Sequence, residues 1–304
     1  MSPHIAVLMG GWSAEREVSL VSGAAVSEAL KTLGYQVSAV DVGHTIGTTL
    51  GELKPDICFN ALHGRFGEDG CIQGVLETLG IPYTHSGVLA SALAMDKPVA
   101  KKIFEAAGIQ CAEGSVVHRD QVLAGEIMDP PYVIKPLNEG SSVGVLIITE
   151  AGSGNPFDHE AWHYGEQVLV ERYIPGREIQ VAVMGDQALG AIEIVPSKQF
   201  YDYEAKYSDG FAEHLMPAPV APGAYEEMLR LAKLAHDELG CRGITRSDFR
   251  YDDTAGEPGQ IYLLETNTQP GMTPLSLAPE IAAHAGFDFP QLVDWLVKDA
   301  GCGR

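Results

Sequence analysis

The first ninety residues constrain the fold most, because short apolar runs alternate there with segments of helical periodicity. The apolar run "HIAVLMGG" is followed by helical "SAEREVSLVSGAAVSEALKTLG", then by strand-like "YQVSAVDV" and "DICFNALHG", and then by helical "CIQGVLETLGI". Strands that alternate with helices are typical of βαβ units, in which the strands are parallel. We therefore predict a small α/β domain with a parallel sheet covered by helices.

Beyond this region, strand-like segments follow one another as hairpins. A helix is expected in "MDKPVAKKIFEAAGI", opened by Asp96 with Pro98 in its first turn. The segment "REIQVAVMGDQALGAIEIVP" reads as two strands joined at Gly185. The fold class predicted for the whole chain is α/β, or α+β overall, with a small parallel-sheet domain followed by two antiparallel lobes. The predicted domains are 1–94, 95–176 and 177–304.

Charge and cysteine usage exclude several functional classes. The 304 residues carry 20 Lys+Arg against 41 Asp+Glu, a formal net charge of −21, which would repel nucleic acid and anionic membrane surfaces. The five cysteines are scattered without a C-x-x-C pair, so neither a disulfide framework nor a zinc site is indicated. The N-terminus resembles no signal peptide and no apolar run is long enough to span a bilayer. We expect a cytoplasmic protein without nucleic-acid or membrane partners.

Four polar side chains are expected on one face of a hairpin near the C-terminus. "GITRSDFRY" and "QIYLLETN" flank the Gly/Pro-rich "DDTAGEPG", which predicts antiparallel pairing with a turn near Gly256. The pairing would bring Asp248 opposite Leu264 or Glu265. Residues two apart in a strand share a face, so Arg246, Asp248, Glu265 and Asn267 should lie together. Carboxylate and amide oxygens suit Mg²⁺ or Mn²⁺. A solvated hairpin face fits the spacing equally well.

A second group of residues could hold a phosphate-bearing ligand. Lys135 precedes the loop "PLNEGSSVGV", whose N–H groups and hydroxyls could cover phosphate oxygens, although it is no Walker loop and a plain flexible hairpin is the alternative. Lys97 and Lys135 could also be ordinary surface lysines. Glu171 and Glu178 flank the hinge-like "RYIPGR", where a nucleotide could be held, or they could be solvated edge charges.

The glycine pair after the first strand suggests another class of protein. "GGWSAEREVS" lies where a dinucleotide-binding turn would, but it lacks the G-x-G-x-x-G spacing, so a Rossmann-type oxidoreductase is the runner-up. Glu15 has a structural explanation, since acidic residues stabilise the first turn of a helix. His63 could likewise be a core histidine without a functional role.

Seven segments in order carry a family resemblance. They are "GGWSAEREVSLVSG", "ALHGRFGEDGCIQG", "MDKPVAKKIF", "YVIKPLNEGSSVGV", "FYDYEAKY", "GITRSDF" and "LLETNTQPGMTPLSL". Together the chain resembles the D-alanine:D-alanine ligase family of the ATP-grasp superfamily. The resemblance implies a two-lobed ATP-grasp fold after the N-terminal domain, ATP and a pair of Mg²⁺ (or Mn²⁺) ions as cofactors, and a homodimer. It also implies that ATP phosphorylates one D-alanine and that a second D-alanine attacks the acyl phosphate, which supplies peptidoglycan synthesis.

The resemblance also implies a role for each matching residue. The residues implied for ATP are Lys97, Lys135, Ser142, Glu171, Arg172, Ile174 and Glu178. Those implied for the metal ions are Asp248, Glu265 and Asn267. Those implied for the chemistry are Glu15, Ser141, Tyr207, Arg246 and Gly271. Those implied for substrate binding are His63, Lys206, Ser276 and Leu277.

Three features bear on substrate choice and on turnover. The chain departs from commoner family patterns at Gln269 and Leu275, beside the second substrate. Tyr207, in the expected lid "QFYDYEAKYSDG", stands where D-alanine:D-lactate ligases carry a histidine, so D-alanine is the expected second substrate and D-lactate the alternative. A nucleotide-binding module without turnover is disfavoured because all the expected metal and phosphate ligands are present.

Overall fold

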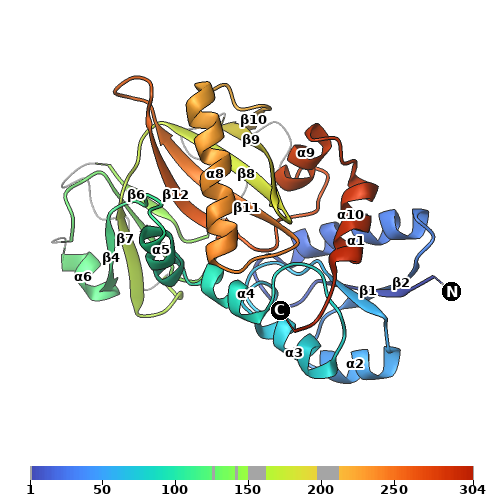
Figure 1. Ribbon diagram of the computed structural model, residues 1–304. Helices are drawn as coiled ribbons and strands as arrows, with labels where there is room; N and C mark the ends of the chain where they lie inside the picture. The colour runs from blue at the N-terminus through green and yellow to red at the C-terminus, as the bar shows by residue number, and fades with distance from the viewer. Residues whose placement is uncertain (1, 125–126, 141–142, 150–161, 197–211, 304) are drawn as a thin grey trace.

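The computed structural model describes residues 2–124, 127–140, 143–149, 162–196 and 212–303 and contains three sheets with helices around them (Figure 1). The first sheet is parallel and has the order β2-β1-β3, as the alternation in the sequence predicts. Its strands are β1 (His4–Met9), β2 (Gln36–Asp41) and β3 (Ile57–Asn60). The helices of this region are α1 (Arg16–Thr32), α2 (Ile46–Leu53), α3 (Cys71–Leu79) and α4 (Val88–Met95).

The second sheet is antiparallel and has the order β4-β7-β5-β6. Its strands are β4 (Gly114–His118), β5 (Tyr132–Lys135), β6 (Leu146–Ile148) and β7 (Gln167–Arg172). The helices that precede it or lie beside it are α5 (Lys97–Ala106) and α6 (Arg119–Ala124). Asp96 caps α5 as expected, since its side chain accepts a hydrogen bond from the Val99 amide at 3.1 Å. Lys97 is therefore fixed at the first position of a capped helix.

The third sheet is also antiparallel, with the order β10-β9-β8-β11-β12. Its strands are β8 (Arg177–Met184), β9 (Gln187–Pro196), β10 (Ala212–Leu215), β11 (Ile244–Asp252) and β12 (Gln260–Asn267). The helices that follow or pack on it are α8 (Pro222–Glu238), α9 (Leu277–His284) and α10 (Phe289–Asp299). The two predicted hairpins are confirmed. Gly185 turns between β8 and β9 with φ of 58°, and Gly256 lies between β11 and β12 with φ of 110°.

The C-terminal end of the chain returns to the N-terminal region, which the sequence did not predict. Helix α10 packs against α1 (Figure 1), and the Tyr35 hydroxyl donates to Asp294 at 2.7 Å. Gly301 exchanges backbone hydrogen bonds with Tyr83. Apolar residues of β1, β3, α9 and α10 share one core, so the parallel sheet is held by both ends of the chain. The domain boundaries drawn from the sequence remain a prediction.

No helix within the described part of the chain has the length and apolar character needed to cross a membrane.

Candidate active site

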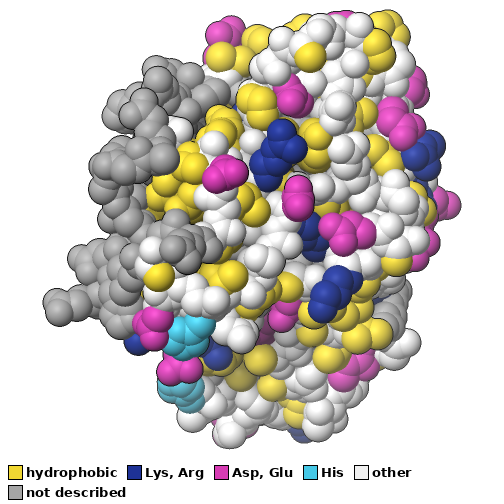
Figure 2. Space-filling view, turned by 90° about the vertical axis from the view of Figure 1, so that its left-hand side faces the viewer, with side chains coloured by type: hydrophobic (Ala, Val, Ile, Leu, Met, Phe, Trp, Pro, Cys, Tyr) yellow, Lys and Arg dark blue, Asp and Glu magenta, His cyan; other side chains and the backbone are white. Residues whose placement is uncertain are grey.

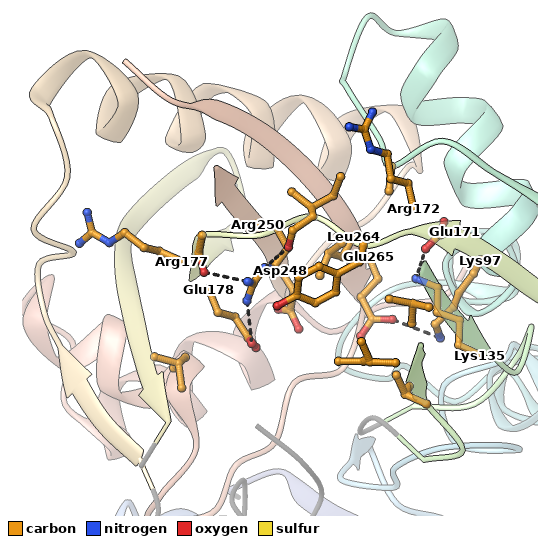
Figure 3. A pocket seen from close by; sticks show the side chains of 18 of the residues that line it. Lys97, Lys135, Glu171, Arg172, Arg177, Glu178, Asp248, Arg250, Leu264 and Glu265 are labelled. Carbon is orange, nitrogen blue, oxygen red and sulfur yellow. Dashed lines mark hydrogen bonds and ion pairs between the residues drawn. The ribbon is translucent and has the colours of Figure 1, made fainter. Parts of the chain in front are cut away.

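A cavity of about 370 Å³ lies between the second and third sheets (Figure 3). Strand β7, the hinge that follows it and the start of β8 form one side, while β11 and β12 form the other. Eight residues predicted from the sequence line it: Lys97, Lys135, Glu171, Arg172, Ile174, Glu178, Asp248 and Glu265. The fold therefore brings together side chains that are up to 168 positions apart (265 − 97 = 168).

Two lysines share one buried carboxylate in this cavity. Glu171 is 5% exposed, contacts Lys101 Nζ at 2.8 Å and forms a second ion pair with Lys135. Burial by itself raises the pKa of Glu171, but the two ammonium groups outweigh burial and hold the pKa below its usual value. The cluster has one net positive charge, which can attract phosphate oxygens. On the face seen in Figure 2, basic and acidic side chains are interspersed. Cationic groups are therefore present at the surface even though the net charge of the protein is −21.

The opposite end of the cavity is held by Arg250. Its guanidinium donates to the carbonyls of Ile174 at 3.1 Å and Gly176 at 2.7 Å, which fixes the hinge after β7 against β11. Arg250 also lies 3.9 Å from Glu178, whose carboxylate faces the cavity (Figure 3). The hinge carbonyls and the Glu178 carboxylate are thus held by one guanidinium, and Glu178 lines the same cavity as Lys97 and Lys135.

The hairpin that carries the candidate metal ligands takes one of the two expected registers. Asp248 lies opposite Glu265 and Arg246 opposite Asn267, with a bulge immediately after Asp248. Arg246 binds Asp248 through two hydrogen bonds of 2.7 and 3.0 Å, and Lys97 Nζ lies 3.1 Å from Glu265. Both carboxylates therefore have cationic partners, and the Asp248 side chain is buried while that of Glu265 is 27% exposed.

The donor set of this hairpin fits a hard cation. Asp248 and Glu265 supply carboxylates on adjacent strands, and Asn267 supplies an amide whose Oδ1 accepts from the Gln269 N–H at 2.9 Å. Among the described residues, no three His, Cys, Asp or Glu side chains lie close enough to hold a metal ion by themselves. Two carboxylates and an amide leave positions for water and phosphate oxygens, which Mg²⁺ usually keeps.

A smaller cavity of about 40 Å³ adjoins the first. The two cavities share the side chains of Lys97, Glu139 and Glu265. The other charged or amide residues of the smaller cavity are Glu15, Glu68, Arg246 and Asn267. A substrate here would lie directly beside the phosphate end of the larger cavity, close enough for a group to pass between them.

The wall of the smaller cavity is acidic and buried. Glu68 accepts from the Gly64 N–H at 2.6 Å, and burial together with the charge of Glu15 raises the pKa of Glu68 well above its usual value. His63 Nε2 lies 3.0 Å from the Ser22 hydroxyl, and burial lowers the His63 pKa to about 4. The imidazole is therefore neutral at neutral pH. His63 lines a separate cavity of about 220 Å³, and its Nδ1 lies 3.9 Å from Glu68 Oε1.

Gly271 and the predicted substrate residues Ser276 and Leu277 lie in the turn before α9 and at its first residue. Ser276 Oγ accepts from the Thr273 N–H at 2.9 Å, and a Cβ on Gly271 would meet this oxygen at 2.6 Å. Glycine is therefore required at 271 for the close approach of backbone and hydroxyl. Leu277 is the first residue of α9.

Some site predictions lie outside the described residues, and some site residues were missed. Ser141, Ser142, Lys206, Tyr207 and the expected lid "QFYDYEAKYSDG" lie outside the described ranges. Lys101 and Glu68 were not singled out. Lys101 is one helical turn after Lys97, a spacing that could have indicated a shared face. Glu68 lies inside the quoted segment "ALHGRFGEDGCIQG", but its burial has no signature in the sequence.

Comparisons with known proteins agree with this geometry. Residues 42–86 match the family model described as D-ala D-ala ligase N-terminus, and residues 103–298 match D-ala D-ala ligase C-terminus. D-alanine–D-alanine ligase B of Mesorhizobium japonicum is 58% identical, with 100% of this chain and 99% of the relative covered. The D-alanine–D-alanine ligase of Parvibaculum lavamentivorans is 55% identical, with coverage of 99% and 98%.

Two solved structures have the same fold over nearly their whole length. The D-alanine–D-alanine ligase of Bacillus anthracis complexed with ATP has a TM-score of 0.81 at 29% identity, with 98% of this chain and 97% of that chain covered. The VanG D-Ala:D-Ser ligase of Enterococcus faecalis has a TM-score of 0.80 at 30% identity, with coverage of 98% and 99%. With two full-length relatives above 50% identity and both family models matched, this chain belongs to the D-alanine–D-alanine ligase family.

Proposed function

We propose that the chain ligates two D-alanine molecules to D-alanyl-D-alanine at the expense of ATP, and so supplies peptidoglycan synthesis. One observation carries the proposal: two adjoining cavities, one lined by cationic and hinge residues and one by acidic residues, share Lys97 and Glu265 on their common wall. Such an arrangement suits phosphoryl transfer from one bound molecule to its neighbour.

In this proposal the larger cavity binds ATP. Lys97 and Lys135 hold the phosphates, and Ser142 covers them from the loop after β5. The adenine lies along the hinge residues 171–174, which include Arg172, and Glu178 binds the ribose. The cationic cluster around Glu171 and the contacts of Arg250 with the hinge carbonyls support this orientation.

The hairpin face would hold a pair of Mg²⁺ or Mn²⁺ ions through Asp248, Glu265 and Asn267. Bound there, the ions would neutralise phosphate charge and polarise the transferred group. Arg246 and Lys97 now contact these carboxylates. We infer that both cations turn toward substrate oxygens when metal and nucleotide are present.

The reaction has two steps that balance without another reagent. The terminal phosphoryl group of ATP moves to a carboxylate oxygen of the first D-alanine, its bond to the bridging oxygen breaks, and ADP results. The deprotonated amine of the second D-alanine then bonds to the acyl carbon, the acyl–phosphate C–O bond breaks, inorganic phosphate leaves, and the nitrogen loses one proton to the released phosphate or to water. Arg246 and the Gly271 N–H are assigned to the oxyanion of this second step, where preorganised donors contribute most.

The substrate residues divide into two groups. Glu15 binds the ammonium of the first D-alanine, and the neutral His63 orients its carboxyl group. Ser141 and Tyr207 are assigned to the connection between Glu15 and the lid. The residues assigned to the carboxylate of the second D-alanine are Lys206, Ser276 and Leu277.

The choice of second substrate is the finer part of the proposal. Tyr207 has no positive charge at neutral pH, so it would not repel the ammonium of a second D-alanine as a protonated histidine would. Competition of D-alanine with D-lactate and D-serine between about pH 6 and 9, a range that brackets histidine titration, tests this. Products are separated by mass, and depsipeptide or D-alanyl-D-serine in excess at neutral pH would reject D-alanine as the preferred second substrate.

We further propose the domains 1–94, 95–176 and 177–304, a cytoplasmic location where ATP is available, and a homodimer. Light scattering of the purified protein decides between monomer and dimer.

The assay that tests the function uses ATP, Mg²⁺ and D-alanine. Phosphate release and dipeptide formation should rise together in a ratio of one to one, and no NAD reduction should occur. Phosphate release without dipeptide would reject the ligase and leave only an ATPase.

A further inference from the structure

Gln269 lies in the turn between β12 and α9 and has no role in the chemistry proposed above. It is 1% exposed. Its backbone N–H donates to Asn267 Oδ1 at 2.9 Å, so it fixes the orientation of a proposed metal ligand. Its carbonyl is close enough to the His63 imidazole to raise the pKa of that ring, although burial is the larger effect and lowers it.

The side chain of Gln269 reaches into the N-terminal region. Its Oε1 accepts from Asn60 Nδ2 at 2.5 Å, and its Nε2 donates to the carbonyl of Leu62, the residue before His63. Asn60 is fully buried and also binds the backbone of Leu62, since its Oδ1 accepts from the Leu62 N–H at 3.2 Å. The two side-chain hydrogen bonds of Gln269 therefore connect segments that are about 200 positions apart in the sequence (269 − 60 = 209).

A second connection runs beside the first. Ser22 Oγ accepts from the Met272 N–H at 3.2 Å and lies 3.0 Å from His63 Nε2. The turn 267–272 and the segment 60–64 are thus held together at two points. The turn carries Asn267 and Gly271, and the segment carries His63.

We propose that Gln269 is a positioning residue that sets the distance between the metal and oxyanion side of the site and the side that holds the first D-alanine. The inference rests on the proposed function, because that function assigns Asn267, Gly271 and His63 to one reaction. Phosphoryl transfer requires the carboxylate and the terminal phosphate in line, and a displacement of about 1 Å can cost about 100-fold in rate.

The nucleotide side has its own supports and should not depend on Gln269. Lys135 is held by Glu171 in the second sheet, and Glu178 and Arg250 are held in the third. Loss of Gln269 should therefore lower kcat while the KM for ATP stays nearly constant. General loosening of the fold would instead change both values together.

The test compares Gln269→Met with Tyr35→Phe. Methionine has nearly the length and volume of glutamine but no hydrogen-bonding amide. Tyr35→Phe removes a different bond, between α10 and the N-terminal region, outside both cavities. Amide hydrogen exchange of 60–64 and 268–272 should rise about 10-fold or more in Gln269→Met and not in Tyr35→Phe, because only the first variant releases the two segments.

Turnover provides the second readout. Gln269→Met should lower kcat by about 10- to 100-fold with a KM for ATP within about twofold of wild type, whereas Tyr35→Phe should leave both near wild type. Unchanged exchange in both segments, or an equal loss of turnover in Tyr35→Phe, would overturn the proposal. If Gln269→Met does not fold, Ser22→Ala is measured in the same way, because it removes the second connection.

The exchange measurement separates this inference from the function. Wild-type protein that forms no dipeptide would reject the function, while released segments in Gln269→Met would still support the connection. Dipeptide formation with unchanged exchange and turnover in the variant would reject the positioning role alone.

Discussion

Glu171 is a buried carboxylate and Glu68 a largely buried one, with a side chain 11% exposed, yet their environments differ in charge. Glu171 lies between Lys101 and Lys135, and their attraction holds its pKa below the usual value despite burial. Glu68 is buried near Glu15, and burial and repulsion raise its pKa. The same side chain is therefore ionised in one cavity and tends to keep a proton in the other.

This difference matches the two ligands that the site is proposed to bind. A triphosphate is anionic and requires cations, while the first D-alanine has an ammonium group that requires one carboxylate, which the proposal assigns to Glu15 beside Glu68. Lys97 and Glu265 lie where the two environments meet. Substitutions that each remove one charge from one cavity test whether activity and stability depend on cationic groups in the larger cavity and acidic groups in the smaller one.

The largest effect is expected at the shared wall. Glu265→Gln should lower turnover about 100- to 1,000-fold, because it removes a carboxylate that neutralises metal and phosphate charge in the transition state. Steady-state assays at saturating Mg²⁺ and ATP measure this, and a thermal melt shows that the variant is folded. Glu227→Gln, which alters an exposed pair with Arg230 on α8, is the matched control and should keep full activity. Wild-type turnover in Glu265→Gln would reject the metal assignment.

The next largest effect is expected on the free energy of unfolding of the protein, from a substitution in the nucleotide cavity. Glu171→Gln should lower the free energy of unfolding at pH 7 by about 3 kcal/mol, because two partly buried ammonium groups lose their carboxylate. The lowered pKa of Glu171 means that its contribution is present above the ordinary glutamate pKa of about 4.3 and is lost as the pH falls through the folded value.

Urea unfolding at pH 7 and at about pH 3.5, below the ordinary glutamate pKa, measures this contrast. The difference between wild type and Glu171→Gln should shrink at the lower pH. A constant difference would mean that the carboxylate contributes by packing and not by its charge.

Glu68→Gln should show the opposite dependence on pH. Because the folded pKa of Glu68 is raised, its contribution is complete below about pH 4.3 and is lost as the pH rises toward the folded value. The uncharged amide has no such loss, so the variant should gain stability relative to wild type between pH 5 and 8. The gain cannot exceed about 1.4 kcal/mol per pH unit. Parallel stability curves would show that Glu68 is ionised in the folded protein.

The smallest effect is expected at His63. Its pKa of about 4 means that the imidazole stays neutral between pH 5 and 8, so its ring nitrogen signals in NMR should not shift over that range. Its contribution to stability is present above about pH 6.5 and is lost as the pH falls toward 4. Titration near pH 6.5 would mean that the acidic wall protonates the ring and that His63 adds a positive charge to the cavity.

Local patterns in the sequence were sufficient for much of the fold. The alternation before residue 90 predicted the parallel sheet, and Gly185 and Gly256 marked the two hairpins because their backbone conformations favour glycine. Helices α2 and α4 were not predicted. Helix α2, with the sequence "IGTTLGEL", contains two glycines and two threonines, which are weak helix formers. The family assignment replaces the alternative of a dinucleotide-binding oxidoreductase.

The sequence by itself determined which site residues share a strand face and which lie at the start of a helix, because both follow from spacing within one element. Arg246 and Asp248 share a strand face because they are two residues apart, and Lys97 could be placed because Asp96 caps its helix. The structure decided that Asp248 lies opposite Glu265 and not Leu264, because a bulge follows Asp248. Only the tertiary structure decided which cations lie beside which carboxylates, since Lys101, Glu68 and Gln269 meet their partners across elements far apart in the chain. Charge and burial act through distance in space, and the sequence gives only distance along the chain.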